Sequence, residues 1–132
     1  MKRTADNLSE VKEDYLETIL LLSKGGAPVR LIDISKAHGV SKSTVSDALS
    51  SLGEHGYVIY EKYRPVILTA KGREVAECVL NRHKLLSFFL TRVLDIPNSE
   101  ADEVACRMEH AIGGNIAFRL AMFMGDFEAK KR

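Results

Sequence analysis

The chain has 132 residues, of which 45% are hydrophobic and 28% are charged, and its formal net charge is +1. This length suits one domain or two very small ones, and no apolar run is long enough to span a bilayer. The N-terminal segment turns acidic where a secretory signal would turn apolar, so the cytoplasm is the expected location and no membrane partner is expected. Cys78 and Cys106 are far apart in the sequence and are predicted not to form a disulfide.

Three helices are predicted in the first part of the chain. Apolar residues at helical spacing indicate a helix over residues 8–24, with Asn7 as its cap. A short helix over residues 31–38 is expected to end at Gly39. Ser41 is then expected to cap a third helix.

The spacing of the apolar residues along the sequence changes after the third helix. Residues 57–61 and 66–68 are rich in β-branched and aromatic side chains and predict a small hairpin. From Thr69, the expected N-cap, the pattern is helical again to about Val93. Two further helices are expected after a break, over residues 99–112, with Ser99 as cap, and over residues 115–127.

Two helices joined through a turn that contains glycine form a helix-turn-helix pattern, and the hairpin takes the position of a wing. The second helix of such a motif enters the major groove of DNA. Residues 30–73 carry seven Lys/Arg against four Asp/Glu, a net +3, whereas the rest of the chain carries −2. The residues expected to contact DNA are basic or hydroxyl-bearing: Lys36, Lys42, Ser43, Thr44, Ser46, Lys62 and Arg64.

The alternative reading of this segment is a polar helix face followed by a charged turn. Asp47 favours that alternative mildly, because a carboxylate repels phosphates. We nevertheless expect a mainly α fold, with an N-terminal winged helix-turn-helix DNA-binding domain in residues 1–73. An all-helical metal-binding and dimerisation domain is expected in residues 74–132.

The stretch ACRMEHAI (105–112) carries a thiol, a carboxylate and an imidazole. On a helix Cys106, Glu109 and His110 would share one face, since residues three and four apart are neighbours. An exposed Glu–His pair beside a half-buried cysteine is the plain alternative to a metal site.

Two further fragments carry potential metal ligands. Asp14 and Glu17 lie three residues apart in the first helix, where helix solvation is the plain alternative. His83 falls on the apolar stripe of the long helix, where it would otherwise be a core histidine satisfied by a hydrogen bond. Imidazole beside thiol and carboxylate ligands suits a divalent transition metal. The three fragments together therefore favour a metal site over three unrelated accidents.

Four segments, SKSTVSDAL, VIYEKYRPVILTAKG, NRHKLLSFFL and ACRMEHAI, resemble the diphtheria-toxin-repressor family over roughly residues 8–125. Its members are homodimeric winged-helix repressors whose affinity for operator DNA is switched on by Fe²⁺ or Mn²⁺. The resemblance implies a short form without the family's SH3-like domain. The metal ligands that it implies come from three segments: Asp14, Glu17, His83, Cys106, Glu109 and His110.

The implied ligand set mixes two branches of the family. Asp14 and Glu17 match the manganese branch, whereas Cys106 matches the iron branch, and Ser87 replaces an ancillary glutamate of the iron branch. Thiolate favours softer metals than carboxylate does. We therefore expect Fe²⁺, with Mn²⁺ close behind and Co²⁺, Ni²⁺ or Zn²⁺ binding in vitro.

The expected mechanism is that the ion ties the first helix to the dimerising half, and so sets the spacing of the two recognition helices. Dimer contacts are expected from the apolar residues of the last two helices: Ile112, Ile116, Phe118, Met122 and Phe123.

Two other functions compete with this one. The first is a winged-helix regulator that ignores metal and senses an organic ligand. The second is a metal-dependent hydrolase, for which we find no H-E-x-x-H motif, no glycine-rich phosphate loop and no nucleophile elbow. The chain is therefore not expected to be an enzyme.

Overall fold

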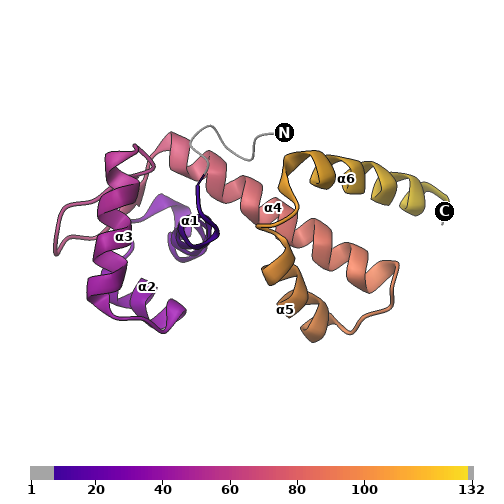
Figure 1. Cartoon of the computed structure of the whole chain (residues 1–132), viewed down its shortest axis with the longest axis horizontal. Helices are drawn as coiled ribbons and strands as arrows, with labels where there is room; N and C mark the ends of the chain where they lie inside the picture. Colours follow the sequence, from indigo (N-terminus) through magenta and orange to yellow (C-terminus); the bar gives the residue numbers. More distant parts are fainter. Residues whose placement is uncertain (1–7, 131–132) are drawn as a thin grey trace. The chain divides into compact units, whose positions relative to one another are not determined.

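The computed structural model describes residues 8–130, which are mainly helical, with six α-helices and one two-stranded sheet. The predicted mainly α fold is therefore confirmed. The chain divides into two compact units, one of residues 9–78 and one of residues 79–130 together with Leu8. Figure 1 shows the helices of each unit along the chain. No helix in the described residues has both the length and the apolar character needed to cross a membrane.

Helix α1 (Glu10–Leu22) opens the first unit, as predicted. Its N-cap is Ser9, whose hydroxyl accepts the backbone N–H of Lys12 at 3.2 Å. The cap is therefore Ser9 rather than Asn7, and Asn7 lies outside the described residues. A 3₁₀ turn, η1 (Lys24–Gly26), follows the helix.

The helix-turn-helix consists of α2 (Leu31–His38) and α3 (Lys42–Glu54). Gly39 ends α2 in the left-handed conformation, with φ 65°, which glycine adopts without steric cost. Ser41 caps α3 by accepting the backbone N–H of Thr44 at 3.1 Å. Both signals are confirmed. The apolar faces of the two helices are buried through Ile34, Val45, Leu49 and Leu52, which leaves the start of α3 exposed.

The hairpin consists of β1 (Val58–Ile59) and β2 (Ile67–Leu68), paired antiparallel with Val58 opposite Leu68. Its strands are shorter than predicted, because the flanking backbone groups find other partners. Tyr57 donates to the carbonyl of Leu52 at 2.9 Å, and Val66 exchanges two bonds with Val29.

The junction between the hairpin and the long helix has room only for glycine at position 72. Helix α4 (Ala70–Arg92) begins after Thr69, whose hydroxyl accepts the backbone N–H of Gly72 at 3.1 Å, as the sequence predicts. A Cβ atom at Gly72 would lie 1.9 Å from the carbonyl oxygen of Tyr57. Any side chain there would push the hairpin away from the start of α4.

The second unit contains residues 79–92 of α4, then α5 (Asn98–Met108) and α6 (Gly113–Lys130). The prediction that the α5 helix starts at a Ser99 cap and reaches residue 112 is wrong. The cap position is Pro97, and the helix stops at Met108 because the chain must turn before α6 begins. Buried Leu86, Leu90, Ala101 and Ala105 form the core of this unit, against Phe89, Ile96, Val104, Ile112 and Leu120.

Helix α6 leaves much of its apolar surface exposed. Within the described chain its only buried residue is Met124. Four of the five residues expected at a dimer interface are exposed, namely Ile116, Phe118, Met122 and Phe123. The fifth, Ile112, packs against the core of the second unit instead.

Candidate metal centre and nucleic-acid interface

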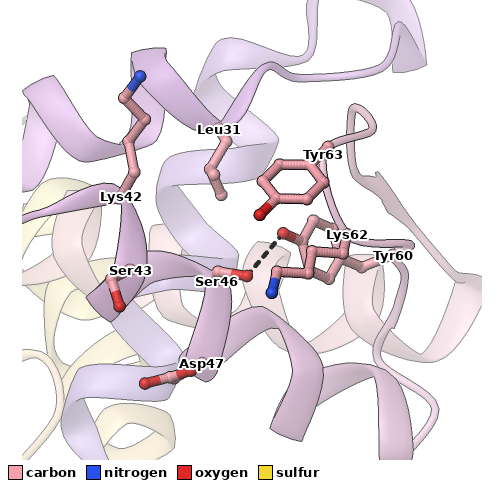
Figure 2. Close-up of a pocket in the computed structure, with 8 residues that line it drawn as sticks. All are labelled: Leu31, Lys42, Ser43, Ser46, Asp47, Tyr60, Lys62 and Tyr63. Carbon is pink, nitrogen blue, oxygen red and sulfur yellow. Dashed lines mark hydrogen bonds between the residues drawn. The ribbon is translucent and has the colours of Figure 1, made fainter.

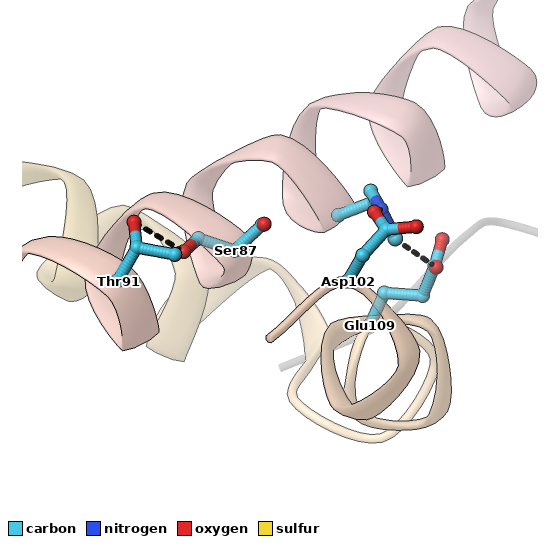
Figure 3. A network of polar contacts seen from close by, with 5 residues as sticks. Ser87, Thr91, Asp102 and Glu109 are labelled. Atoms are coloured by element: carbon cyan, nitrogen blue, oxygen red, sulfur yellow. Dashed lines mark hydrogen bonds and ion pairs between the residues drawn. The ribbon is translucent and has the colours of Figure 1, made fainter. Parts of the chain in front are cut away.

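The imidazole of His83 lies between the carboxylates of Asp102 and Glu109. Figure 3 labels these two acidic residues. Its Nδ1 is 2.9 Å from Oε1 of Glu109, at the C-terminal cap of α5. Its Nε2 is 2.6 Å from Oδ1 of Asp102, within α5. The sequence analysis missed Asp102 as a residue of this site. It lies four residues before Cys106, and that helical spacing was the available signal.

Glu109 is buried where an isolated carboxylate is costly. Its side chain is 0% exposed, and within residues 8–130 its Oε2 has no hydrogen-bond partner. Arg82 donates to the backbone carbonyl of Glu109 at 3.2 Å, not to this oxygen. Oε1 faces His83, so one oxygen of this buried carboxylate is left without a partner, which is costly unless a bound cation satisfies it. The orphaned oxygen therefore fits a metal ligand.

The thiol of Cys106 completes a group of three. Ligand atoms of His83, Cys106 and Glu109 all lie within 4.8 Å of one another. Cys106 is exposed, so an ion could reach the group from solvent, and no disulfide joins it to Cys78. Nitrogen, sulfur and oxygen donors together suit a divalent transition metal better than Mg²⁺ or Ca²⁺.

The alternative of an exposed Glu–His pair is wrong. His110, which follows Glu109 in the turn after α5, is 7% exposed, and both side chains are buried. The alternative of a histidine satisfied by hydrogen bonds describes His83 in part, because both of its ring nitrogens have carboxylate partners.

The carboxylates also change the protonation of His83. Partial burial lowers the pKa of the imidazole, but the hydrogen bonds and charges of Asp102 and Glu109 outweigh it and raise the pKa above its ordinary value. The two carboxylates therefore favour an imidazolium that donates one N–H to each. Because a metal ligand must offer a lone pair, protons compete with metal at this ring.

The two carboxylates expected from the first helix lie on α1 in the first unit. Glu17 is 6% exposed. Oδ2 of Asp14 is 3.8 Å from Nδ1 of His38, the last residue of α2. The other nitrogen of His38 is 2.8 Å from the hydroxyl of Thr18, and its ring stacks on Tyr15 with centroids 4.4 Å apart. His38 thus links the end of α2 to Asp14.

The start of α3 and the hairpin line one pocket (Figure 2). Lys42, Ser43 and Asp47 contribute from the exposed start of α3. Ser46 also faces this pocket, but its hydroxyl is 2.8 Å from that of Tyr60. The Thr44 hydroxyl is likewise 2.9 Å from that of Ser41. These two predicted DNA contacts are therefore partly engaged within the protein.

The hairpin tip presents aromatic and basic groups together. Tyr63 is 84% exposed, with φ 68°, and the ammonium of Lys62 lies 5.3 Å from its ring centroid. Arg64 pairs with Glu61 at 3.5 Å. Lys36 is exposed on α2. Sequence reasoning missed both tyrosines, although the run YEKYR interleaves aromatic and basic residues.

A winged helix-turn-helix followed by a helical unit with imidazole, thiol and a buried carboxylate defines a metal-responsive DNA-binding regulator. The chain belongs to the iron-dependent repressor family, whose members are iron- or manganese-dependent transcriptional repressors. Residues 7–66 match the family's N-terminal DNA-binding domain, and residues 69–132 match its metal-binding and dimerisation domain. The family resemblance and the functional class predicted from the sequence are confirmed.

Two regulators are similar to nearly the whole chain. The HTH-type transcriptional regulator MJ0568 of Methanocaldococcus jannaschii is 36% identical over 124 residues, which are 93% of this chain and 99% of that protein. The HTH-type transcriptional regulator MntR of Bacillus velezensis is 32% identical over 123 residues, 91% of this chain and 86% of that protein.

The similarity extends to a solved structure, a manganese-dependent transcriptional repressor in complex with manganese. It is 30% identical, with a TM-score of 0.76, over 86% of this chain and 52% of that one. The chain therefore spans about half the length of that repressor.

Proposed function

We propose that the protein is a homodimeric repressor that binds operator DNA when loaded with Fe²⁺ or Mn²⁺, and that it is not an enzyme. The observation that carries the proposal is the buried Glu109, which has one oxygen without a hydrogen-bond partner and forms a ligand group with His83 and Cys106. The cytoplasm is the location that this function requires. The bound ion would supply the positive charge that these ligands lack.

We assign six residues to the metal ligands. His83, Cys106 and Glu109 form the group described above, and His110 follows in the same buried turn. Asp14 and Glu17 are assigned from the family resemblance and from their spacing on α1. The carboxylates are hard ligands that Mn²⁺ and Fe²⁺ accept, while the thiolate favours the later metal. Fe²⁺ is therefore the preferred ion and Mn²⁺ the second.

A contact within the first unit supports a link from metal to DNA. Asp14 lies next to His38, which immediately precedes the turn between α2 and α3. An ion held by Asp14 would compete for the carboxylate that faces His38. Metal binding at Asp14 would thereby affect the position of His38 and of the turn that precedes the recognition helix α3. Such coupling between two sites is typically about 1–3 kcal/mol and is reciprocal.

The DNA contacts that we propose follow from the exposed cations. Lys42 lies in the first turn of α3, where the helix N-terminus also favours phosphate. Ser43 is positioned for a base edge or a phosphate, and Lys62 for the backbone. In the dimer, the two α3 helices would enter successive major grooves about 34–36 Å apart. The exposed apolar residues of α6 supply the surface for dimerisation.

Metal-dependent DNA binding is the direct test of this function. The protein, stripped by a chelator under anaerobic conditions, is expected to bind operator DNA weakly. Added Fe²⁺ or Mn²⁺ should raise the affinity about 5- to 150-fold, whereas Mg²⁺ should not. Fluorescence anisotropy with operator DNA measures the change, and calorimetry measures metal binding. The result would indicate a regulator of another kind if calorimetry detects no binding of Fe²⁺ or Mn²⁺ and the chelator does not change the DNA affinity.

Replacing Lys42 by alanine tests the DNA face. The substitution should weaken binding at every metal level, because it removes a phosphate contact and not a metal ligand. The slope of log K against log salt should fall by about one for each protomer bound. Lys24→Ala, an exposed lysine of η1, is the matched control and should leave the slope unchanged. Equal salt slopes for the two variants would show that Lys42 does not contact the DNA backbone.

A further inference from the structure

We propose that Asp102 is a positioning residue of the metal centre, which holds the Nε2–H of His83 so that Nδ1 faces Glu109 and the ion. This inference rests on the proposed function, because it assigns a role relative to a bound metal.

The argument begins with the two nitrogens of one ring. Neutral imidazole has one N–H donor and one lone-pair acceptor, and only the acceptor can bind a metal. Asp102 Oδ1 lies 2.6 Å from Nε2, where a carboxylate can only accept a hydrogen. Glu109 Oε1 faces Nδ1 in the same way, so without an ion each carboxylate can accept an N–H. An ion bound by the ligand group would displace the proton on Nδ1, and the Nε2–H would stay with Asp102.

Nδ1 is the nitrogen that faces Glu109 of the ligand group. It lies 2.9 Å from Glu109 Oε1, and Glu109 belongs to the ligand group with Cys106. Metal-bound histidines almost always donate their other N–H to a carboxylate, carbonyl or water, and the loss of that partner costs about 10- to 100-fold in metal affinity. Asp102 provides such a partner.

The geometry disfavours Asp102 as a ligand of the same ion. The two ring nitrogens point in different directions, so a carboxylate bonded to Nε2 lies away from an ion on Nδ1. Asp102 also lines a surface pocket with Lys84, whose positive charge disfavours a second cation there. The Asp102 side chain is 69% exposed, so its role does not require a buried charge.

Two substitutions separate positioning from ligation. Asp102→Asn keeps an oxygen that accepts the Nε2–H but makes a much poorer metal ligand, whereas Asp102→Ala removes both. Glu103→Ala, an exposed neighbour on α5, is the matched control. Two readouts apply, namely ¹⁵N NMR of the His83 tautomer in metal-free protein at a pH where the ring is neutral, and Mn²⁺ titration.

We expect Asp102→Ala to shift the neutral ring from the Nε2–H toward the Nδ1–H tautomer, because Glu109 still accepts the Nδ1–H. Asp102→Asn should keep the Nε2–H tautomer as the wild type does. The Mn²⁺ affinity should fall about 10- to 100-fold in Asp102→Ala, less in Asp102→Asn, and not in Glu103→Ala, with the number of ions unchanged. The proposal is overturned if Asp102→Ala keeps the wild-type tautomer and affinity. It is also overturned if both Asp102 variants lose one ion per subunit, since Asp102 would then be a ligand.

Failure of the proposed function gives a different result. If the wild type binds neither Mn²⁺ nor Fe²⁺, the proposed metal centre is wrong. The proposed role of Asp102 in that centre is then wrong as well. If the wild type binds metal and Asp102→Ala matches it, the proposed function stands and only the role of Asp102 fails.

Discussion

Replacing Glu109 by glutamine is expected to abolish metal-stimulated operator binding. Glutamine keeps the size of the side chain and its hydrogen-bonding capacity toward His83, but it carries no negative charge. Because Glu109 is 0% exposed, water cannot replace the lost ligand. The metal affinity should fall by more than the roughly 10- to 100-fold typical of a residue that only orients a ligand. Mn²⁺ titration and anisotropy with operator DNA, each with and without metal, measure the two losses. His110→Ala should have the same effect on DNA binding.

The same variant should not damage the metal-free fold. Glu109 Oε2 has no hydrogen-bond partner among residues 8–130, and where His83 is neutral a glutamine removes a buried charge that no imidazolium offsets. Above the pKa of His83, thermal unfolding in chelator should therefore show Glu109→Gln to be at least as stable as the wild type. Glu103→Gln, an exposed glutamate of α5, is the control for the loss of one charge. Full metal-dependent repression by Glu109→Gln or His110→Ala would show that the ligand assignment is wrong.

The residue types of the candidate site could be predicted from the sequence, but its burial could not. The sequence indicates a metal site because three types of ligand lie within five residues, at Cys106, Glu109 and His110. Cys106 lies on a helix as predicted, but α5 stops at Met108, so the placement of Glu109 and His110 within that helix was wrong. The burial of Glu109 depends on how the chain turns into α6, and no local signal encodes that packing.

Asp102 shows a different limit of the sequence analysis. Its contact with His83 joins α5 to α4 across 19 residues of sequence. Helical spacing places Asp102 on the same face as Cys106, but an exposed aspartate on a helix is an ordinary observation. Only the position of the His83 ring distinguishes Asp102 from Glu103 next to it.

The caps and turns of the first unit were predictable because they depend on neighbouring residues. Ser41, Gly39 and Thr69 each act within four residues of their own position. The lengths of the hairpin strands were not predictable in the same way. Tyr57 and Val66 bond to residues outside the hairpin, and the contact between Gly72 and the Tyr57 carbonyl is equally non-local.

Acid is expected to weaken metal binding through His83. Its pKa is raised in the folded protein, so the ring gains a proton as the pH falls through a value above the ordinary one of about 6.5. A protonated ring has no lone pair for the ion. Each proton that the metal must displace lowers the affinity by about tenfold per pH unit. Calorimetry in two buffers of different ionisation enthalpy counts the protons released, and NMR follows the titration of His83.

The metal-free protein should show the opposite dependence. A group whose folded pKa is raised stabilises the fold fully below its unfolded pKa, and this contribution is lost as the pH rises through the folded pKa. Raising the pH over this range should therefore reduce the His83 contribution to metal-free stability while metal affinity increases. In Asp102→Asn, which removes one of the charges that raise the pKa, both changes should move to lower pH. Metal affinity that stays flat from about pH 6 to 8 would exclude His83 as a ligand.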